Sequence, residues 1–498
     1  MHYDKMSCLL LYLLCIISGR VSATLTETIQ KSDGVETGLN RNDLVAQYER
    51  LEAHESEIEE SLQRSPQQEQ ILERIVRSTP VEETTHFRSM GDTIEEVNRH
   101  AGLGKLLYQS DIVLTDEQFN DIIDDIEAKN GRKKRQAVNK KIHGEQVWPN
   151  GVVYYYFHSQ INVNISRLFM KGIAQWSSQT CIDFVENRFA ITRIQIASHE
   201  EGCWTTVGPV MYKAQRLNLG EGCDLIGSVV HEIGHILGFW HTQARMDRDR
   251  YILLLLENIE RDEGKNFLIS DSTKNENYGI PYDFGSVMHY GSKMFSVNDN
   301  HTMFPIDERY IDTMGSPFIS FYDLLMMNIL YDCLGKCKHN PRTAKCKMGG
   351  FPNPRDCTKC VCPGGYGGRL CDERPAGCGK VLQATTTYQE LNDTIGDNNI
   401  YLSNQADDYK MCHYWIQAPK GRKVEVRIKH FSHRNVVIDG CFIAGFEIKS
   451  QRDQGMTGYR YCSPAYIGKY FVSHNNLLPI ITWSKAWAVT VSLVYKYI

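Results

Sequence analysis

Three features are missing from this sequence of 498 residues. It has no cysteine between residues 24 and 180, no apolar stretch of about 20 residues after its first 23, and no large excess of charge. A net charge of −5 and an isoelectric point near 6.4 do not favour nucleic acid or an anionic membrane surface as a general partner. The apolar run within the first 23 residues is too short to span a bilayer, and no later run approaches about 20 residues, so the sequence predicts no transmembrane helix.

The first 23 residues have the order of a signal peptide. The first residues, Met1 to Lys5, are followed by an apolar run from Cys8 to Ile17 and then by the small residues Val21, Ser22 and Ala23. We therefore expect residues 1–23 to be removed and the protein to be secreted into the extracellular space. Three glycosylation sequons fit the same compartment, and their asparagines are Asn164, Asn300 and Asn392.

The cysteines also indicate an oxidising compartment. Two of the 16 lie in the predicted signal peptide, and the others fall in groups of four, six and four, as in extracellular modules with separate disulfides. These groups are Cys181, Cys203, Cys223 and Cys333; Cys337, Cys346, Cys357, Cys360, Cys362 and Cys371; and Cys378, Cys412, Cys441 and Cys462. The alternative is a zinc ribbon, whose ligands would be Cys333, Cys337, Cys357 and Cys360. Even counts favour disulfides instead.

The main chemical motif lies at residues 231–241, which read His-Glu-Ile-Gly-His-Ile-Leu-Gly-Phe-Trp-His. On an α-helix, His231 and His235 lie one turn apart on one face and can bind one metal ion. Gly238 can adopt the left-handed conformation that ends a helix, so that the chain turns back and His241 supplies a third nitrogen. Three ligands leave a tetrahedral zinc ion one position for water, whose pKa falls to about 7, and Glu232 can accept its proton. The motif predicts a hydrolytic zinc site.

Further motifs identify a family. Ser286-Val287-Met288-His289-Tyr290 supplies the methionine turn that marks metzincins, and the residues after His241 read Thr-Gln-Ala-Arg-Met-Asp-Arg-Asp. Together these motifs resemble the astacin family of zinc endopeptidases. The resemblance extends over most of the chain and is strongest to invertebrate, nematode-type members with EGF-like and CUB modules.

The resemblance implies a role for each residue of the motifs. His231, His235 and His241 bind one Zn²⁺ ion per catalytic domain, and Glu232 acts as the general base. Met288 lies beneath the metal. Tyr290 is a mobile fifth ligand that moves to stabilise the oxyanion.

One departure from the family pattern concerns the residue after the third histidine. The family carries a glutamate directly after the third histidine, where it receives the ammonium group of the mature N-terminus, but this chain has Thr242. The basic run Arg132-Lys133-Lys134-Arg135 predicts cleavage by a furin-type protease after Arg135, which leaves Gln136 first. An N-terminal glutamine can cyclise and lose its charge. We therefore expect that acceptor and ammonium were lost together, because a buried carboxylate without a cation is costly.

Residues 24–135 have the character of a propeptide, because they are charged and contain no cysteine. An amphipathic helix is predicted by the spacing of Leu44, Tyr48, Leu51, Ile58 and Leu62. Residues 106–112 resemble the propeptide motif aromatic-x-Gly-Asp, whose aspartate binds the catalytic zinc and displaces water. Asp111 is the candidate for this latch, with Ser110 in the place of the usual glycine. Asp92, which follows Gly91, is the alternative.

The catalytic domain is expected over residues 136–335. Sequence patterns predict a turn at 148–151 followed by a buried aromatic strand, a helix at 168–175, a strand at 191–197, the metal helix at 225–240 and a helix at 320–330. The family resemblance implies two lobes, with a mixed sheet and helices above, a mostly irregular lobe below, and zinc at the base of the cleft between them. It also implies the disulfides Cys181–Cys333 and Cys203–Cys223.

Two smaller modules are expected after the catalytic domain. Residues 336–372 resemble an EGF-like module, whose small core needs disulfides. Residues 378–498 alternate as half-buried strands do, which predicts a β-sandwich, and they resemble a CUB domain. The family's calcium ligands are not matched, because residues 431–434 contain no carboxylate and Ala444 replaces an aspartate. We therefore predict no calcium there and expect this module to bind a matrix or substrate protein.

The sequence thus predicts a multidomain α+β protein of the metzincin fold class. Its expected function is that of a secreted zinc endopeptidase, made as a zymogen, that cuts peptide bonds in extracellular, matrix or cuticle-like proteins. Its expected partners are these protein substrates and a furin-type processing protease. The alternative is a catalytically silent matrix-binding protein that acts through its EGF-like and CUB modules.

Overall fold

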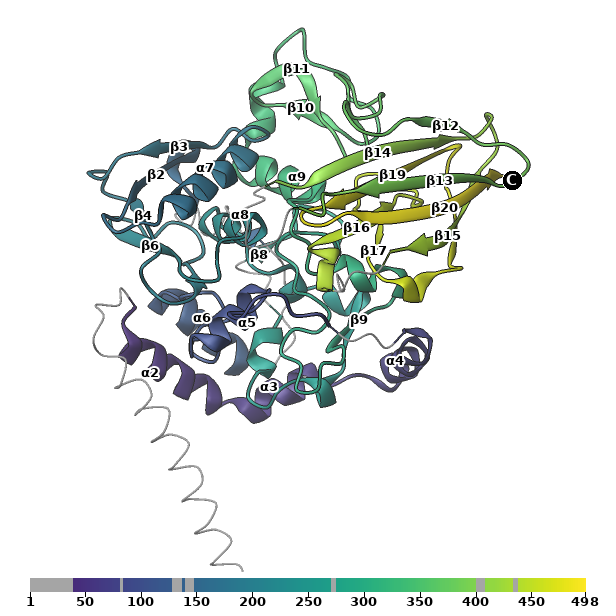
Figure 1. Cartoon of the computed structure of the whole chain (residues 1–498). Helices are drawn as coiled ribbons and strands as arrows, with labels where there is room; N and C mark the ends of the chain where they lie inside the picture. Colours follow the sequence, from purple (N-terminus) through teal and green to yellow (C-terminus); the bar gives the residue numbers. More distant parts are fainter. Residues whose placement is uncertain are drawn as a thin grey trace, which may run out of the picture.

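The computed structural model describes residues 39–80, 84–127, 137–138, 147–269, 275–399, 408–432 and 438–498. The predicted signal peptide, the processing site at Arg135, and the residues His433 and Arg434 lie outside this part of the chain. Within it, none of the helices combines the length and the apolar character that a bilayer-spanning segment needs. Figure 1 shows an N-terminal group of helices beneath a mixed α and β region, which lies beside two packed sheets.

A sheet and two helices form the upper lobe of the mixed region. The strand order is β3-β2-β4-β6-β5, with β5 antiparallel at the edge and the other strands parallel. The strands are β2 (Val152–Phe157), β3 (Asp183–Glu186), β4 (Arg193–Ala197), β5 (Cys203–Trp204) and β6 (Ala214–Leu219); the helices are α7 (Val163–Ser177) and α8 (Ile226–Ile236). Gly172 of α7 lets the two helices approach closely, because a Cβ there would lie only 2.8 Å from Cδ1 of Ile233.

Strand β2 is present where the sequence predicts it, but it is half-buried rather than buried. Val153 and Tyr155 point into the core, where the Tyr155 ring lies 5.2 Å from the ring of Phe169 on α7. On the other face, Tyr156 lies beneath the guanidinium groups of Arg188 and Arg193. The helix covers the first face, so the alternate aromatic residues of the second face remain near solvent.

The lower lobe is mostly irregular, as the family resemblance implied. Its regular elements are the pair β7 (Ile252–Leu254) and β9 (Met303–Pro305), the pair β1 (Ala137–Val138) and β8 (Asn275–Glu276), and the helix α9 (Phe321–Leu330). Helix α9 begins where predicted, because the Ser320 hydroxyl accepts a hydrogen bond from the backbone N–H of Asp323 in a capping box. The structure contains the disulfides Cys181–Cys333 and Cys203–Cys223 that the resemblance implied.

The N-terminal segment packs across the mixed region as short helices. These are α2 (Arg41–Glu52), α3 (Glu55–Leu62), α4 (Pro66–Ser78), α5 (Ile94–His100) and α6 (Asp116–Glu127). The single amphipathic helix predicted for residues 44–62 is therefore two helices, α2 and α3. The break lets Leu51 join a hydrophobic cluster that contains Trp240, while Ile58 and Leu62 join a different cluster that contains residues of the lower lobe.

A hairpin with three disulfides follows the mixed region. Strands β10 (Phe351–Asn353) and β11 (Asp356–Val361) pair antiparallel, and the disulfides are Cys337–Cys357, Cys346–Cys360 and Cys362–Cys371. All four cysteines of the alternative zinc ribbon are in disulfides, so that interpretation is wrong. Disulfide-bonded sulfurs are not available as thiolate ligands.

Two sheets packed face to face form the predicted β-sandwich. One sheet has the order β12-β14-β19-β16-β17 and the other the order β13-β20-β15-β18. The strands are β12 (Val381–Gln383), β13 (Gln389–Ile395), β14 (Lys410–Gln417), β15 (Val424–Phe431), β16 (Ala444–Ile448), β17 (Tyr459–Tyr461), β18 (Tyr470–Val472), β19 (Leu477–Ser484) and β20 (Val489–Tyr497). Disulfides join Cys378 to Cys412 and Cys441 to Cys462.

The three sequon asparagines lie at or near the surface. Asn300 and Asn392 are exposed, and Asn164 in the first turn of α7 is half-buried. Their positions are therefore compatible with glycans, and glycosylation remains a prediction.

Candidate metal centre

Helix α8 and the turn that follows it place the three histidines. The helix ends at Ile236, four residues earlier than the predicted end at Trp240, because Gly238 adopts φ 103° and turns the chain. The N–H of Phe239 donates to the carbonyl of Gly234 at 3.0 Å and closes this turn. The chain then runs back beneath α8, so that His241 reaches the face that carries His231 and His235.

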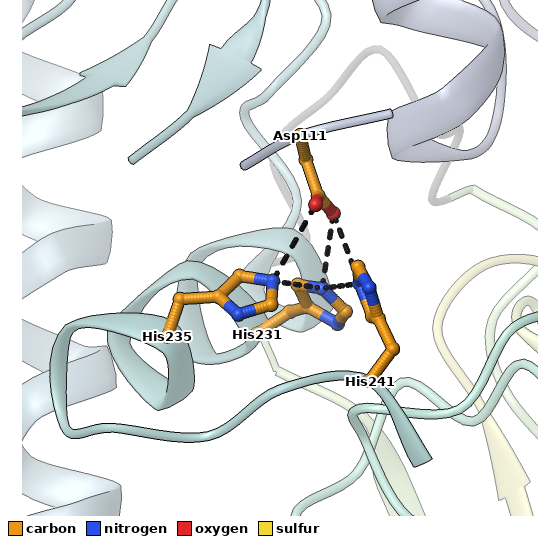
Figure 2. Close-up of side chains that lie close together, drawn as sticks. All are labelled: Asp111, His231, His235 and His241. Carbon is orange, nitrogen blue, oxygen red and sulfur yellow. Dashed lines mark hydrogen bonds and ion pairs between the residues drawn. The ribbon is translucent and has the colours of Figure 1, made fainter. Parts of the chain in front are cut away.

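The three imidazoles converge on one point. Nε2 of His231 lies 3.1 Å from Nε2 of His235 and 3.0 Å from Nε2 of His241. Asp111 approaches from the opposite side (Figure 2), with Oδ2 at 3.2 Å from Nε2 of both His231 and His241 and Oδ1 at 3.5 Å from Nε2 of His235. Two ligand atoms that are each about 2.1 Å from a tetrahedral zinc ion lie about 3.4 Å apart, so these four groups are close to the spacing of a zinc site.

Each histidine has its other ring nitrogen bound elsewhere. Nδ1 of His231 lies 2.7 Å from the carbonyl oxygen of Val287, and Nδ1 of His235 lies 2.8 Å from that of Phe239. Nδ1 of His241 lies 2.8 Å from the side-chain oxygen of Gln109. These oxygens only accept, so each Nδ1 carries the proton and each Nε2 presents a lone pair.

Burial disfavours the charged form of His235 and of His241. It lowers the pKa of His235 and lowers that of His241 to about 3, although Asp111 opposes this shift in both. Three converging lone pairs and a carboxylate repel one another unless a cation lies between them, so the donor set fits a divalent metal ion and zinc in particular.

Two further predicted residues flank this point. Glu232 is fully buried, and neither of its carboxylate oxygens has a hydrogen-bond partner among the described residues. Burial, reinforced by the charge of Asp111, raises its pKa well above the usual value. Met288 packs beneath the helix, where a Cβ on Gly234 would lie 2.5 Å from the methionine sulfur. A side chain at residue 234 would therefore displace the methionine.

Tyr290 is near the histidines but does not contact them by hydrogen bonds. Its ring lies 4.6 Å from the ring of His241, and its hydroxyl donates to the backbone carbonyl of Gln109 at 2.7 Å. Gln109 thus contacts both His241 and Tyr290. Sequence reasoning did not single out Gln109, and its only signal is its position two residues before Asp111.

The structure separates the two candidates for the propeptide latch. Asp111 lies among the three histidines. Asp92 instead accepts a hydrogen bond at 2.8 Å from the backbone N–H of Phe87, within its own N-terminal segment. Gln109 and Ser110 have φ of 48° and 72°, so the chain reaches the site through two left-handed residues. The usual glycine of the family motif would adopt this conformation without strain, and Ser110 adopts it nevertheless.

Thr242 belongs to a hydrogen-bonded chain that ends on helix α9. Its hydroxyl donates to Oγ of Ser286 at 2.9 Å, and Ser286 donates to Oδ1 of Asp323 at 2.6 Å. The other oxygen of Asp323 accepts from the N–H of Val287 at 3.0 Å. Asp323 therefore positions the methionine turn, a role that sequence reasoning missed although the capping box Ser320-x-x-Asp323 is visible in the sequence.

Comparisons with known proteins identify relatives of this chain. The family model described as Astacin, a peptidase family, matches residues 140–332. Zinc metalloproteinase nas-31 of Caenorhabditis elegans is 43% identical over 410 residues, which cover 82% of this chain and 66% of that protein. Zinc metalloproteinase nas-32 of the same organism is 35% identical over 408 residues, covering 81% of this chain and 60% of that protein. The chain thus spans slightly less than two thirds of the length of these two relatives.

A further relative is matched over nearly its whole length. Zinc metalloproteinase nas-25 of Caenorhabditis elegans is 32% identical over 381 residues, which cover 74% of this chain and 92% of that protein. Among solved structures, high choriolytic enzyme 1 of Oryzias latipes, a hatching enzyme zinc-protease, is 29% identical to this chain. The match covers 39% of this chain and 98% of that chain, and its TM-score is 0.36. The family model covers the histidine-bearing region, the Caenorhabditis elegans relatives match most of the chain, and the chain belongs to the astacin family.

Proposed function

We propose that this chain is the precursor of a secreted zinc endopeptidase that hydrolyses peptide bonds in extracellular or matrix proteins. The convergence of three imidazole Nε2 atoms beside the buried carboxyl group of Glu232 is the observation that carries the proposal. A structural histidine cluster would use these nitrogens in hydrogen bonds. Here each Nε2 faces the other two and a carboxylate instead.

The residues of the site divide the chemistry between them. His231, His235 and His241 would hold the zinc ion. When bound, zinc would supply a Lewis acid that polarises a carbonyl oxygen and lowers the pKa of water. Glu232 would accept the proton of the attacking water and deliver it to the leaving amine, for which both of its carboxylate oxygens are available.

The edge strand β5 would align the substrate. In the precursor, the backbone of residues 111–113 pairs with Thr205 next to this strand: Thr205 N–H donates to the carbonyl of Asp111 at 3.1 Å, and Val113 N–H donates to the carbonyl of Thr205 at 2.8 Å. An extended substrate would use the same backbone groups after the propeptide has left.

Residues 24–135 would act as the inhibitory propeptide. Asp111 would provide a fourth ligand through a carboxylate oxygen, and the carbonyl of Gln109 accepts a hydrogen bond from the Tyr290 hydroxyl. Cleavage by a furin-type protease after Arg135 would release both, and Tyr290 could then donate to the oxygen on which negative charge develops. The hydroxyl chain from Thr242 to Asp323 supports an active form that needs no buried N-terminal ammonium.

The remaining modules complete the proposed precursor. We assign residues 1–23 to the signal peptide, 136–335 to the protease domain, 336–372 to an EGF-like module and 378–498 to a CUB domain. The three disulfides of the hairpin and the two-sheet sandwich with its two disulfides support these assignments. The sandwich is expected to contact a matrix or cuticle-like substrate protein.

The variant Glu232→Gln tests the function. Processed protein should contain about one zinc ion per chain and cleave peptides. The variant should keep its zinc and lose cleavage by at least about 100-fold, because it lacks the proton acceptor. Glu186→Gln, at an exposed position of β3, is the matched control and should cleave normally. Processed protein that contains zinc but cleaves nothing would favour the catalytically silent matrix-binding protein, and processed protein without zinc would contradict both the metal site and the proposal.

A further inference from the structure

The β-sandwich forms one wall of the cleft that contains the metal centre. A cavity of about 80 Å³ lies beside His231 and Tyr290, and the sandwich contributes Ile438, Asp439 and Phe442 to its lining. The first turn of α8, the methionine turn and the loop before α9 also line it, together with residues 92–94 and Asp111 of the N-terminal segment. Residues from two modules therefore share one cavity next to the proposed zinc ligands.

The sandwich contacts the residue directly after Tyr290. Asp439 accepts hydrogen bonds from the Ser292 hydroxyl at 2.8 Å and from the backbone N–H of Lys293 at 2.7 Å. A Cβ on Gly291 would lie 2.4 Å from Oδ2 of Asp439. This approach is possible only because residue 291 is glycine, so the protease segment is adapted to the sandwich.

The same adaptation is seen at two other contacts. A Cβ on Gly440 would lie 2.0 Å from the carbonyl oxygen of Gly315. A Cβ on Gly227, in the first turn of α8, would lie 3.1 Å from Cε2 of Phe442. The Phe442 ring thus packs directly on the helix that carries His231 and His235.

Buried polar pairs fix the sandwich in this position. Thr457 donates to Asp283 through its N–H and its hydroxyl, both at 3.1 Å. Arg460 donates to the Ser316 hydroxyl at 2.6 Å. One continuous hydrophobic cluster contains residues of the lower lobe and of the sandwich. Modules joined by a large apolar interface move as one body, unlike modules on a flexible linker.

The propeptide occupies the space in front of this wall. Thr93 and Ile94 line the same cavity, and the Phe87 ring lies 5.3 Å from the ring of Trp487 on the sandwich. Lys293 also donates to the Thr84 hydroxyl at 2.8 Å. When the propeptide leaves, Ile438 and Phe442 become available to a peptide chain that passes the metal.

We propose that Ile438 and Phe442 form a subsite of the substrate cleft that selects an aliphatic side chain on one side of the scissile bond. The inference rests on the proposed endopeptidase function. The lining is apolar at Ile438, Phe442 and Pro317, and the carboxylate of Asp439 is already engaged by Ser292 and Lys293. Ile94 of the propeptide is the aliphatic residue found at this place in the precursor.

Cleavage of a peptide library by processed, full-length protein tests the proposal. Phe442→Ala should enlarge the subsite, so that kcat/KM for peptides with an aromatic residue at one position rises about tenfold relative to peptides with leucine there. Ile438→Phe should fill the subsite and shift the preference at the same position towards small residues. Preferences on the other side of the scissile bond should not change. Tyr470→Ala, at an exposed position of β18, is the matched control.

Failure of the subsite and failure of the endopeptidase function would give different results. If the wild type cleaves peptides but Phe442→Ala and Ile438→Phe leave the preference unchanged at every position, the subsite is refuted. If the wild type cleaves nothing, the proposed function itself fails. Thermal unfolding and zinc content identify a variant that does not fold, and in that case the other variant decides.

Discussion

The substitution Ser110→Gly should strengthen the contact through which the proposed propeptide would inhibit the enzyme. Ser110 has φ 72°, which costs an L-residue about 1–2 kcal/mol. Its buried hydroxyl has no hydrogen-bond partner among the described residues, which costs about 1–3 kcal/mol. Glycine removes both costs. It adds about 0.5–1 kcal/mol of backbone entropy and about 1 kcal/mol for the small void that the hydroxymethyl group leaves.

The net gain is about 1–2 kcal/mol in favour of the bound propeptide. Since 1.4 kcal/mol is a factor of about ten, the residual activity of uncleaved precursor should fall by about 5- to 30-fold. The measurement is peptide cleavage by precursor that carries Arg135→Ala and cannot be processed. Ser110→Ala is the matched control, because it removes the hydroxyl but keeps the strained φ, and it should show a smaller fall. Unchanged or higher residual activity in Ser110→Gly would refute this account of residues 109–111.

Three further predictions address the latch, the methionine turn and its anchor. Asp111→Ala in the same unprocessed precursor should release peptide cleavage, because the carboxylate beside the three histidines is lost; a precursor that stays silent would place the latch elsewhere. Gly234→Ala should lower the free energy of unfolding by about 1–3 kcal/mol, because the new Cβ would lie 2.5 Å from the Met288 sulfur. Thermal or denaturant unfolding measures this change, and unchanged stability would show that the methionine can move aside. Burial raises the pKa of Asp323 from 3.8 to about 6 in the folded protein, so folding favours the protonated form of this side chain. The contribution of that form to stability is therefore present below pH 4 and is lost as the pH rises through 6. Asp323→Asn should therefore flatten the loss of stability between pH 4 and 6, and a pH profile that keeps its slope would contradict that pKa.

Much of the fold could be predicted where local pattern and burial agree. The helix that begins after Ser320 has a complete capping signal, and the alternating runs of the sandwich became strands β15 and β20. The prediction for residues 44–62 was less accurate, because a regular apolar spacing does not reveal that its two halves pack against different clusters. For β2, the aromatic run gave no sign that one face would be covered by arginines rather than by a helix.

At the metal centre, too, some contacts could be predicted and others could not, and the difference is how far apart the residues lie in the sequence. His231, Glu232, His235 and His241 lie within one helix and its turn, so backbone geometry alone brings them together, and the sequence by itself determined the donor set and the proton acceptor. The tertiary structure decided what surrounds them. Gln109 is 132 residues away in sequence from His241, whose Nδ1 it contacts. Asp439 is 146 residues away from Lys293, whose backbone N–H donates a hydrogen bond to it. Contacts over such separations depend on how whole modules pack, which no local pattern of residues encodes.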